Sequence, residues 1–480
     1  MSSFATHLLA CFFLSAARAD ELSIDFNNAI GMTSDGYVSF NFDWHLNSEE
    51  SPAWYNSSVL VLDLKNPQLV YLASQLSPGH LRVGGSEGDV AIYDVGTHSP
   101  CKPGFCMSMD RWHELVEFCQ AAKIRLVFGL NAMYGRKNKT SHFDSTNTQA
   151  LLEYTAKNKL PVYGFEFGNE LQSKIDPSYM ADDYITIRQM INELWPDSST
   201  RPWLIGPDEN PNEDFLKKLL QKAGYAMNAS TYHIYPGYGL DPHLPQQILT
   251  SSYLNKEGSL AAKLGKDINE TAPNVEGWVG ETAAAWHSGR NGTTNTFLSG
   301  FWYLDALASV ASQNQKAFCR QTLVGGNYEL LNKNTTDPYP DYFTALLFKR
   351  LMGMKFLQVK ANISDDLRVY AACSNPEAAE AGAVTTAFLN INNSTSFSFT
   401  IAGLSGDQAD REEFHLSSGE EGTLQSSTVK LNNKILQLQD GKLPDMSGMS
   451  QSRESPIVVK PLTYGYILFK NANAAVCSKN

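Results

Sequence analysis

The chain has 480 residues, a formal net charge of −12, and a hydrophobic fraction of 42%. This length is too great for one small domain and suits two or three, and the hydrophobic fraction is ordinary for a globular protein with a sizeable core. The acidic balance argues against general binding of polyanions. The sequence also lacks a glycine-rich phosphate loop and a basic–aromatic pattern, so we expect no nucleic-acid partner.

The first 19 residues are typical of a signal peptide. Residues 8–17 (LLACFFLSAA) form a short apolar run, and Ala17-Arg18-Ala19 has the small-x-small pattern of a cleavage site. This run is too short to span a bilayer, and no later run reaches about 18 apolar residues. We therefore expect a protein without a transmembrane segment that is secreted, or that reaches a lysosome or vacuole through the secretory pathway.

Asn-x-Ser/Thr triplets are frequent, and in a secreted protein they mark surface acceptors for N-linked glycans. The acceptor asparagines are Asn56, Asn138, Asn228, Asn269, Asn291, Asn334, Asn362, Asn392 and Asn393. The adjacent pair at 392–393 is expected to carry one glycan at most. Six cysteines remain once Cys11 leaves with the signal segment, and they allow many alternative disulfide pairings. No cysteine–histidine cluster has zinc spacing, so we expect no metal.

Strand-like and helical segments alternate along residues 20–354. The strands are expected to begin at Tyr37, Leu81, Ile124, Val162, Trp203, Ser230, Gly277 and Ala317. Helices are expected at 110–122, capped by Asp110, and at 148–157, 177–195, 213–223, 254–268, 295–313 and 344–352. Strands that alternate with helices form a parallel sheet, and eight such strands predict a closed (β/α)8 barrel.

Two glutamates stand at the ends of predicted strands. Residues 161–170 (PVYGFEFGNE) form a covered strand that stops before Asn169, with Glu170 at its tip, and residues 277–281 (GWVGE) end in Glu281. The C-terminal strand ends carry the active site of such a barrel. A lone glutamate there is usually a solvated strand-end residue. Two on one barrel can serve as general acid and nucleophile at a glycosidic bond.

After about residue 355 the pattern changes to short strand-like runs separated by Gly, Asn, Ser and Pro. These runs lie at residues 367–373, 384–390, 396–401, 428–431 and 464–469. They predict an antiparallel β-sandwich domain over residues 355–480, attached to the barrel over residues 20–354. The alternating run at about residues 21–27 is expected to join this sandwich.

The whole mature chain resembles the heparanase-like β-glucuronidases of glycoside hydrolase family 79. The resemblance runs through LSPGHLRVGG, FGLNAMYGRK, FEFGNE, WVGET, SGFWYLDALA, RQTLVGGNYELL, PDYFTALLFKRLMG and TYGYILFKNANAAVC. It implies a barrel with an attached β-sandwich and a retaining mechanism without metal or cofactor. The connection at residues 86–110 is much shorter than the excised linker of animal heparanases, so we expect no activation by cleavage.

The resemblance also implies roles for individual residues. Glu170 would be the acid/base and Glu281 the nucleophile. Glu170 is then expected to hold its proton, with a pKa raised by the nearby carboxylate. The residues implied in substrate binding are Asp43, Ser86, Asn169, Tyr235, Gln321, Gly326, Asn327 and Tyr328. The turn at 326–328 would bind the uronic carboxylate through backbone N–H groups and the phenol, and Arg82 would support the site. For each supporting residue the alternative is a structural role, in which the polar side chain forms hydrogen bonds inside the barrel and does not contact the substrate.

The resemblance implies a disulfide between Cys373 and Cys477. A second disulfide between Cys101 and Cys106 is a weaker expectation, and the two other cysteines, Cys119 and Cys319, are expected to be buried thiols.

These observations predict an exo-acting β-glucuronidase, expected to be a monomer, whose partner is a glucuronic-acid-containing carbohydrate or a glucuronide. The alternatives are an endo-acting, heparanase-type enzyme that cuts heparan sulfate, a non-catalytic glycan-binding relative, and another barrel glycosidase such as an arabinofuranosidase or a β-xylosidase. The acidic charge favours exo action, as do the few basic residues expected near the site. Those residues are a cluster of Arg136, Lys137 and Lys139, and a separate Arg290.

Overall fold

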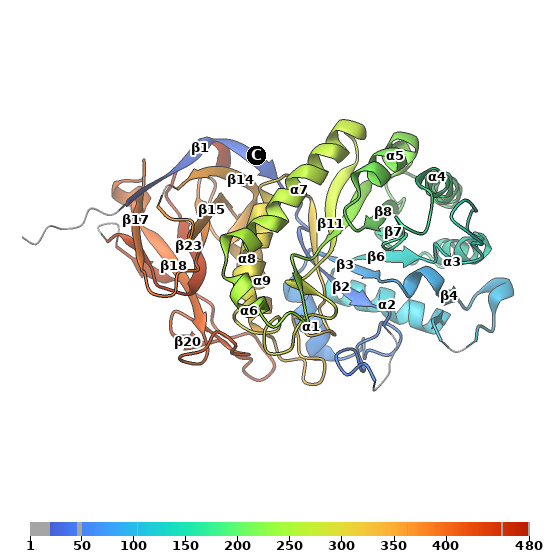
Figure 1. Ribbon diagram of the computed structural model, residues 1–480, viewed down its shortest axis with the longest axis horizontal. Helices are drawn as coiled ribbons and strands as arrows, with labels where there is room; N and C mark the ends of the chain where they lie inside the picture. Colours follow the sequence, from blue (N-terminus) through green and yellow to red (C-terminus); the bar gives the residue numbers. More distant parts are fainter. Residues whose placement is uncertain (1–19, 46–49, 103, 362, 453–454, 479–480) are drawn as a thin grey trace, which may run out of the picture.

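The computed structural model describes residues 20–45, 50–102, 104–361, 363–452 and 455–478. Within these residues, eight parallel strands close into a barrel (Figure 1). In chain order they are β2 (Val38–Asp43), β3 (His80–Gly84), β6 (Arg125–Leu130), β7 (Gly164–Phe167), β8 (Trp203–Glu209), β9 (Ala229–Ile234), β11 (Glu276–Thr282) and β13 (Ala317–Arg320). The predicted (β/α)8 barrel is therefore confirmed.

Helices follow most of these strands. They are α1 (Pro67–Gln75), α2 (Met109–Ala122), α3 (Thr146–Lys157), α4 (Pro177–Leu194), α5 (Glu213–Ala223), α6 (Leu244–Ile248), α7 (Ser251–Thr271), α8 (Ser299–Ala311) and α9 (Pro340–Leu351). The sequence analysis missed α1, although Asn66 caps it by accepting the backbone N–H groups of Gln68 and Leu69. The cap of α2 is Ser108, which accepts from the N–H of Arg111, and Asp110 lies inside the first turn.

An antiparallel sheet domain follows α9, as predicted. Its strands are β14 (Met352–Lys360), β15 (Leu367–Ser374), β16 (Val384–Asn390), β17 (Phe397–Ile401), β18 (Arg411–Ser418), β19 (Val429–Leu431), β20 (Lys434–Ile435), β21 (Met449–Gln451), β22 (Ile457–Val459) and β23 (Thr463–Phe469). The N-terminal strand β1 (Asp20–Met32) lies between β14, which it meets antiparallel, and β17, which it meets parallel. β14 and β18 were not predicted, because charged residues interrupt their apolar runs.

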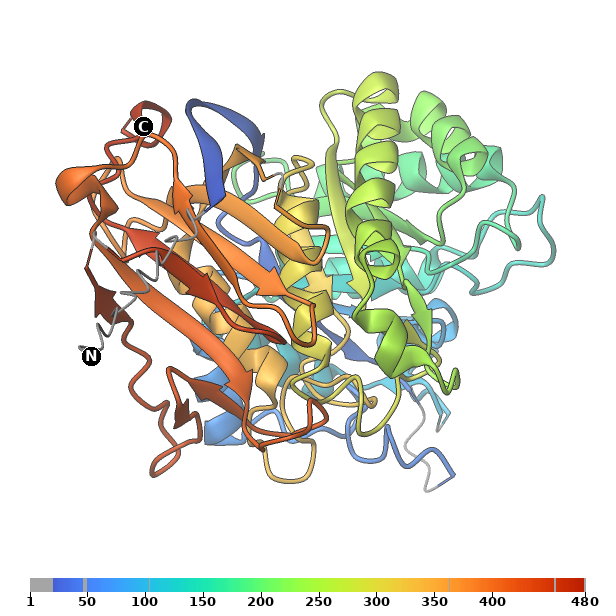
Figure 2. The same ribbon diagram turned by 60° about the vertical axis from the view of Figure 1, so that its left-hand side comes forward.

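The strands of this domain form one connected 11-stranded sheet in the described residues, and strands far apart in its order share an apolar core separate from that of the barrel. Leu22 of β1 and Phe399 of β17 are buried in the same cluster as Phe388 of β16 and Ile467 of β23. The sheet packs against α8 and α9, which lie between it and the barrel (Figures 1 and 2). Every residue of α8 is buried as a result, which explains why this helix is apolar on all sides.

The described residues contain two disulfides, Cys101–Cys106 and Cys373–Cys477, and two buried free thiols, Cys119 and Cys319. The second disulfide joins the end of β15 to the last turn of the chain, η5 (Ala475–Cys477). No helix in the described part of the chain is long and apolar enough to cross a membrane. The expected signal segment, residues 1–19, lies outside the described residues.

Most of the glycan acceptors that the structure describes are exposed. The exposed ones are Asn56, Asn138, Asn269, Asn291, Asn334 and Asn393. Asn228 is half-buried, and its Oδ1 accepts from Arg188 and from the N–H of Leu204. Asn392 is also half-buried and donates through Nδ2, the atom a glycan would modify, to Asp366. The acceptor at position 362 lies outside the described residues.

Candidate active site

Glu170 and Glu281 come together at the C-terminal end of the barrel. Glu170 follows β7 by three residues, and its N–H donates to the carbonyl of Asp208 at 2.8 Å. Between the end of β7 and Glu170, Gly168 adopts a φ of +92°, a conformation in which glycine is favoured. Glu281 lies inside β11. A carboxylate oxygen of Glu170 and one of Glu281 lie within 4.8 Å of each other, a spacing compatible with the ~5–5.5 Å between the carboxyl groups of a retaining pair.

Arg82 of β3 connects the strand ends that carry these groups. Its guanidinium contacts Glu166 at 2.7 Å, Asp208 at 2.6 Å and Glu281 at 2.9 Å, and it donates to the side-chain oxygen of Asn169 at 2.7 Å. The side chain is only 2% exposed. One buried cation is therefore shared by three carboxylates from three strands, and it touches one oxygen of Glu281 directly.

Tyr235 holds the other oxygen of Glu281. Its hydroxyl donates to Oε1 of Glu281, while Arg82 donates to Oε2. Both oxygens of this carboxylate thus accept a hydrogen bond, one from each residue. The phenol itself is buried, and burial together with the charge of Glu281 raises the pKa of Tyr235 well above its usual value.

His233 of β9 was missed by the sequence analysis. Its Nδ1 lies 2.8 Å from Oε1 of Glu170, and its Nε2 lies 3.1 Å from Asp208 and 4.0 Å from Glu281. Burial alone would lower the pKa of His233, but the charges of Glu281 and Asp208 and its hydrogen bonds outweigh burial and raise the pKa to about 10. The sequence feature that could have identified His233 is its position two residues before Tyr235, which puts both side chains on the same face of the predicted strand.

The protonation of Glu170 differs from the prediction. Burial favours its neutral form, but the hydrogen bond and charge of His233, with a further hydrogen bond from Asn210, outweigh burial and lower the pKa of Glu170. The expected upward shift is therefore wrong for the unliganded site. The opposite shifts of the two pKa values favour an ion pair between a protonated His233 and an ionised Glu170.

Asp43 and Gln321 form a second polar group beside the carboxylates. Gln321 donates to one oxygen of Asp43 at 2.8 Å, and the backbone N–H of His45 donates to the other at 2.9 Å. Burial, followed by the charges of Glu281 and Glu87, raises the pKa of Asp43 to about 7. Ser86, which is exposed, accepts a long hydrogen bond of 3.5 Å from the amide of Asn169.

The turn at residues 326–328 only partly matches its predicted role. The N–H of Gly326 donates to the carbonyl of Ala53 at 2.9 Å, and the N–H of Asn327 donates to the carbonyl of Ser288 at 2.8 Å. These two donors are already used to fix the turn, so they are not available to a substrate carboxylate. Tyr328 does line the cavity that contains Glu170 and Glu281.

The cavity around the two glutamates has a volume of about 930 Å³. Its walls come from the loops after β8, β9 and β11 and from one face of α7. The lining residues are Glu170, Asn210, Pro211, His233, Ile234, Tyr235, Pro236, Lys256, Ser259, Leu260, Lys263, Glu281, Trp286, His287 and Tyr328. The residues that line the cavity do not include Asp43, Ser86, Asn169 or Gln321.

The predicted basic cluster is smaller than expected. Arg136 has a side chain only 1% exposed, and it forms an ion pair with Asp183 at 2.6 Å. Lys137 and Lys139 remain exposed. Arg290 is half-buried and donates to the carbonyl of Asp241 at 3.4 Å.

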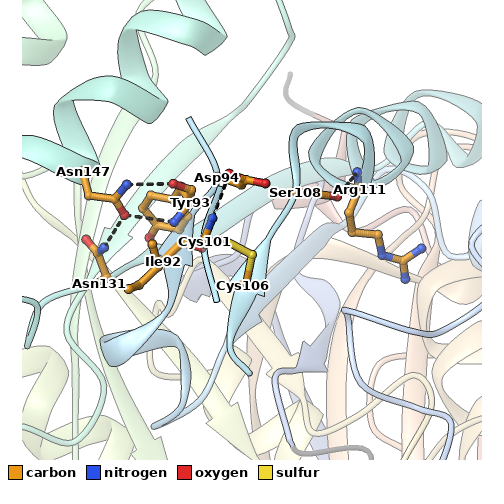
Figure 3. The surroundings of a disulfide bond; sticks show 9 residues. All are labelled: Ile92, Tyr93, Asp94, Cys101, Cys106, Ser108, Arg111, Asn131 and Asn147. Atoms are coloured by element: carbon orange, nitrogen blue, oxygen red, sulfur yellow. Dashed lines mark hydrogen bonds between the residues drawn. A yellow bond between two sulfur atoms is a disulfide. The ribbon is translucent and has the colours of Figure 1, made fainter. Parts of the chain in front are cut away.

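The connection at residues 86–110 is fixed to the barrel (Figure 3). The short strands β4 (Ile92–Tyr93) and β5 (Cys106–Met107) pair within it, and the Cys101–Cys106 disulfide closes the intervening loop. The side chain of Asn147, on α3, accepts from the N–H of Tyr93 at 2.9 Å and donates to its carbonyl at 2.8 Å (Figure 3). Because buried Asn147 holds the backbone of Tyr93 on both sides, the described part of this segment is fixed to α3, but none of its residues lines the cavity around the two glutamates.

Glu170, His233 and Glu281 could each direct one ligand atom towards a metal ion. A protonated imidazole has no lone pair for a metal, and His233 already uses Nδ1 with Glu170. The donor set in this protonation state therefore does not fit a metal ion.

The chain is similar to several known proteins. The model of the glycosyl hydrolase family 79 N-terminal domain matches residues 19–308. Heparanase-like protein 1 of Arabidopsis thaliana is 34% identical, covering 93% of this chain and 92% of the relative. Baicalin-beta-D-glucuronidase of Scutellaria baicalensis is 30% identical, with 92% and 90% covered. The GH51 arabinofuranosidase structure from Xanthomonas axonopodis pv. citri superposes with a TM-score of 0.65 at 15% identity, covering 93% and 98% of the two chains, and indicates the fold alone.

Proposed function

The chain belongs to glycosyl hydrolase family 79, and from this premise we propose that it is a retaining β-glucuronidase. The main support for the proposal is the pair of carboxylates at the barrel end, Glu170 and Glu281. One carboxylate oxygen of Glu170 lies within 4.8 Å of one of Glu281. In this assignment Glu281 is the nucleophile and Glu170 the acid/base. A glycosidase acting on carbohydrate follows from the family, whereas the roles of individual residues and the glucuronide specificity are the proposal.

In the first step Glu281 attacks the anomeric carbon of the sugar. A glycosyl ester forms, the bond from that carbon to the leaving oxygen breaks, and Glu170 supplies the proton that this oxygen takes up. In the second step Glu170 removes a proton from water, and the water oxygen displaces Glu281 from the anomeric carbon. Arg82 and Tyr235 support both steps, because they stabilise the Glu281 carboxylate before attack and after release.

His233 supplies the proton that the unliganded Glu170 lacks. Its Nδ1 is 2.8 Å from Oε1 of Glu170, so a proton can move between them without rearrangement. A sugar that fills the cavity excludes water from this pair, and loss of water favours the neutral carboxylic acid. We therefore assign the general acid to the Glu170–His233 pair, with Glu170 as the group that touches the leaving oxygen.

Specificity for a uronic acid is proposed from the relatives and from Tyr328. One relative is a beta-D-glucuronidase by its printed name, and a phenol in the cavity beside Glu281 is suited to bind a carboxylate. Asp43 and Asn169 are proposed to bind sugar hydroxyls, with Gln321 and His45 orienting Asp43. Ser86 accepts from Asn169 and is proposed to orient it.

Exo action on terminal glucuronic acid remains the favoured mode. The described part of the segment at 86–110 is held by Asn147 and closed by a disulfide, so it is a fixed loop, although it does not line the cavity around the two glutamates. The burial of Arg136 removes one of three cations from the loop expected to meet a sulfated chain. Endo action on heparan sulfate is the second candidate, supported by the exposed Lys137 and Lys139.

Hydrolysis of an aryl β-D-glucuronide, followed by proton NMR of the first-formed product, tests this function. We expect release of β-glucuronic acid before mutarotation, which demonstrates retention. Aryl β-D-glucoside, β-D-xyloside and α-L-arabinofuranoside serve as matched substrates, and faster turnover of any of these would overturn the glucuronidase assignment. A glucuronide-capped oligosaccharide and heparan sulfate then separate the two modes of action. Rapid shortening of heparan sulfate chains would overturn exo action.

The disulfides fit an oxidising compartment. We propose a secreted or lysosomal or vacuolar glycoprotein that acts as a monomer, with the exposed asparagines as its glycan acceptors and the boundary between its two domains close to residue 355.

A further inference from the structure

Two aromatic rings are stacked on the loops that follow β9 and β11. Tyr238 belongs to β10 (Gly237–Tyr238) and Trp286 to β12 (Ala285–Trp286). Their ring centres are 4.4 Å apart, with an angle of 29° between the planes. Trp286 is 49% exposed and Tyr238 36% exposed. Contiguous exposed aromatic surface of this kind marks a binding site more often than isolated apolar residues do.

This ring pair is held in place before any ligand binds. β10 and β12 pair in parallel, with Tyr238 opposite Trp286, and the N–H of Gly239 donates to the carbonyl of Trp286 at 3.0 Å. A Cβ atom on Gly239 would come within 2.3 Å of the carbonyl oxygen of Gly289, so the two loops meet at a position that accepts only glycine. Because the rings are already ordered, a ligand that stacks on them loses little conformational entropy of the protein.

The stacked pair of Tyr238 and Trp286, which we call the aromatic platform, adjoins the candidate active site. Trp286 lines the cavity that contains Glu170 and Glu281, and Tyr238 lies against Trp286 without lining that cavity in the described part of the chain. Ile234, Pro236 and Leu260 add further apolar surface to the same cavity. A group attached to the leaving oxygen therefore has a flat apolar surface within the cavity where its bond is broken.

The two lysines in this part of the cavity already have interaction partners within the protein. The ammonium of Lys256 donates to the carbonyl of Pro236 at 2.7 Å and lies 5.3 Å from the centre of the Tyr253 ring. Lys263 forms an ion pair with Glu213. These are the only lysines or arginines among the described residues that line the cavity. Their engagement favours an uncharged flat group over a sulfated sugar.

We propose that Trp286, supported by Tyr238, binds the aglycone, and that the preferred aglycone is a flat, uncharged aromatic group. The inference rests on the proposed function, since it names the substrate class of the same site. In the bound substrate the aromatic group stacks on the indole, and the linking oxygen lies at Glu170. Stacking in both the bound substrate and the transition state lowers KM more than it raises kcat.

The test compares Trp286→Ala with the wild type on two glucuronides, 4-methylumbelliferyl β-D-glucuronide and methyl β-D-glucuronide. We expect kcat/KM for the aryl substrate to fall about tenfold or more, mainly through KM, and the fall to be at least about fivefold greater than for the methyl substrate. Trp286→Phe should restore most of the loss because it keeps an aromatic face. Tyr225→Ala is the matched control, since Tyr225 is 79% exposed and does not line the cavity.

Equal losses on the two substrates would overturn the platform while leaving the glucuronidase proposal intact. A glucuronide-capped disaccharide provides a third arm. Trp286→Ala could impair hydrolysis of this substrate more than hydrolysis of the aryl glucuronide. That result would show that the platform binds a sugar, and the proposed preference for an aromatic aglycone would be wrong. Failure of the wild type to hydrolyse any of the three glucuronides would instead overturn the proposed function, so the two failures are distinguishable.

Discussion

Nδ1 of His233 and Oε1 of Glu170 lie 2.8 Å apart, and in this pair the pKa of the histidine is raised to about 10 while that of the glutamate is lowered. The cause is the surrounding charge, because Asp208 and Glu281 also face the imidazole. A residue that sequence reasoning missed therefore governs the protonation of one that it identified.

Replacing His233 by Asn should raise the pKa of Glu170. The cation that now lowers this pKa would be lost, while the burial that raises it would remain. Because Glu170 would then keep its proton to a higher pH, we expect the pH above which hydrolysis of a substrate with a poor leaving group declines to move upward. The pH dependence of kcat/KM would report the shift as an ionisation displaced to higher pH. An unchanged profile would show that His233 does not control this group.

Glu281→Gln should abolish turnover of every substrate, because an amide cannot form the glycosyl ester of the proposed mechanism. Glu170→Gln should retain more activity on substrates with good leaving groups, which need little protonation. Steady-state kinetics on aryl glucuronides of graded leaving-group acidity measure both effects. Circular dichroism spectra matching the wild type provide the control for folding. Near-normal activity of Glu281→Gln would refute its assignment as nucleophile.

Arg82→Met should destabilise the protein by about 3–5 kcal/mol, because the buried Glu166 and Asp208 and the partly buried Glu281 would lose their shared cation. Urea denaturation measures the change. The matched control is Arg125→Met, whose ion pair with Asp35 lies at the surface, with side chains 32% and 53% exposed. A surface pair contributes about 0.2–1 kcal/mol, so the control should be much milder. Equal destabilisation by the two substitutions would show that the ion pairs of Arg82 contribute no more to stability than a surface ion pair does.

Tyr328→Phe should reduce the preference for glucuronides over glucosides. Removal of one hydrogen bond to a charged group costs about 1.5–3 kcal/mol, which corresponds to a fall of roughly tenfold or more in the ratio of kcat/KM values. Asn327 and Gly326 serve the turn through backbone bonds, so the phenol is the group to test. A ratio that does not change would exclude Tyr328 from carboxylate recognition.

The double variant Cys373→Ala/Cys477→Ala should lose stability. This disulfide closes a separation of 104 residues, for which the chain-entropy model gives about 4–5 kcal/mol. Cys101→Ala/Cys106→Ala is the comparison, because its separation is only 5 residues and the same model predicts a smaller effect. Thermal unfolding under non-reducing conditions measures both. A larger loss for the short loop would contradict the entropic account.

The sequence by itself determined the barrel and the two glutamates, because both depend on local patterns. Alternation of strand and helix periodicity specifies a parallel sheet, and Glu170 and Glu281 stand at or near the C-terminal ends of strands that buried residues define. β14 and α1 were missed where charged residues or an overlooked cap obscured the local pattern.

The tertiary structure alone decided which groups meet. The proton on His233 depends on carboxylates from β8 and β11, and the burial of Arg136 depends on Asp183, 47 residues away. Similarly, the N–H of Gly326 is occupied by Ala53, a partner distant in sequence. Electrostatic shifts and hydrogen-bond occupancy are set by neighbours within a few ångströms. Those neighbours come from different strands, so no pattern along one strand could have revealed them.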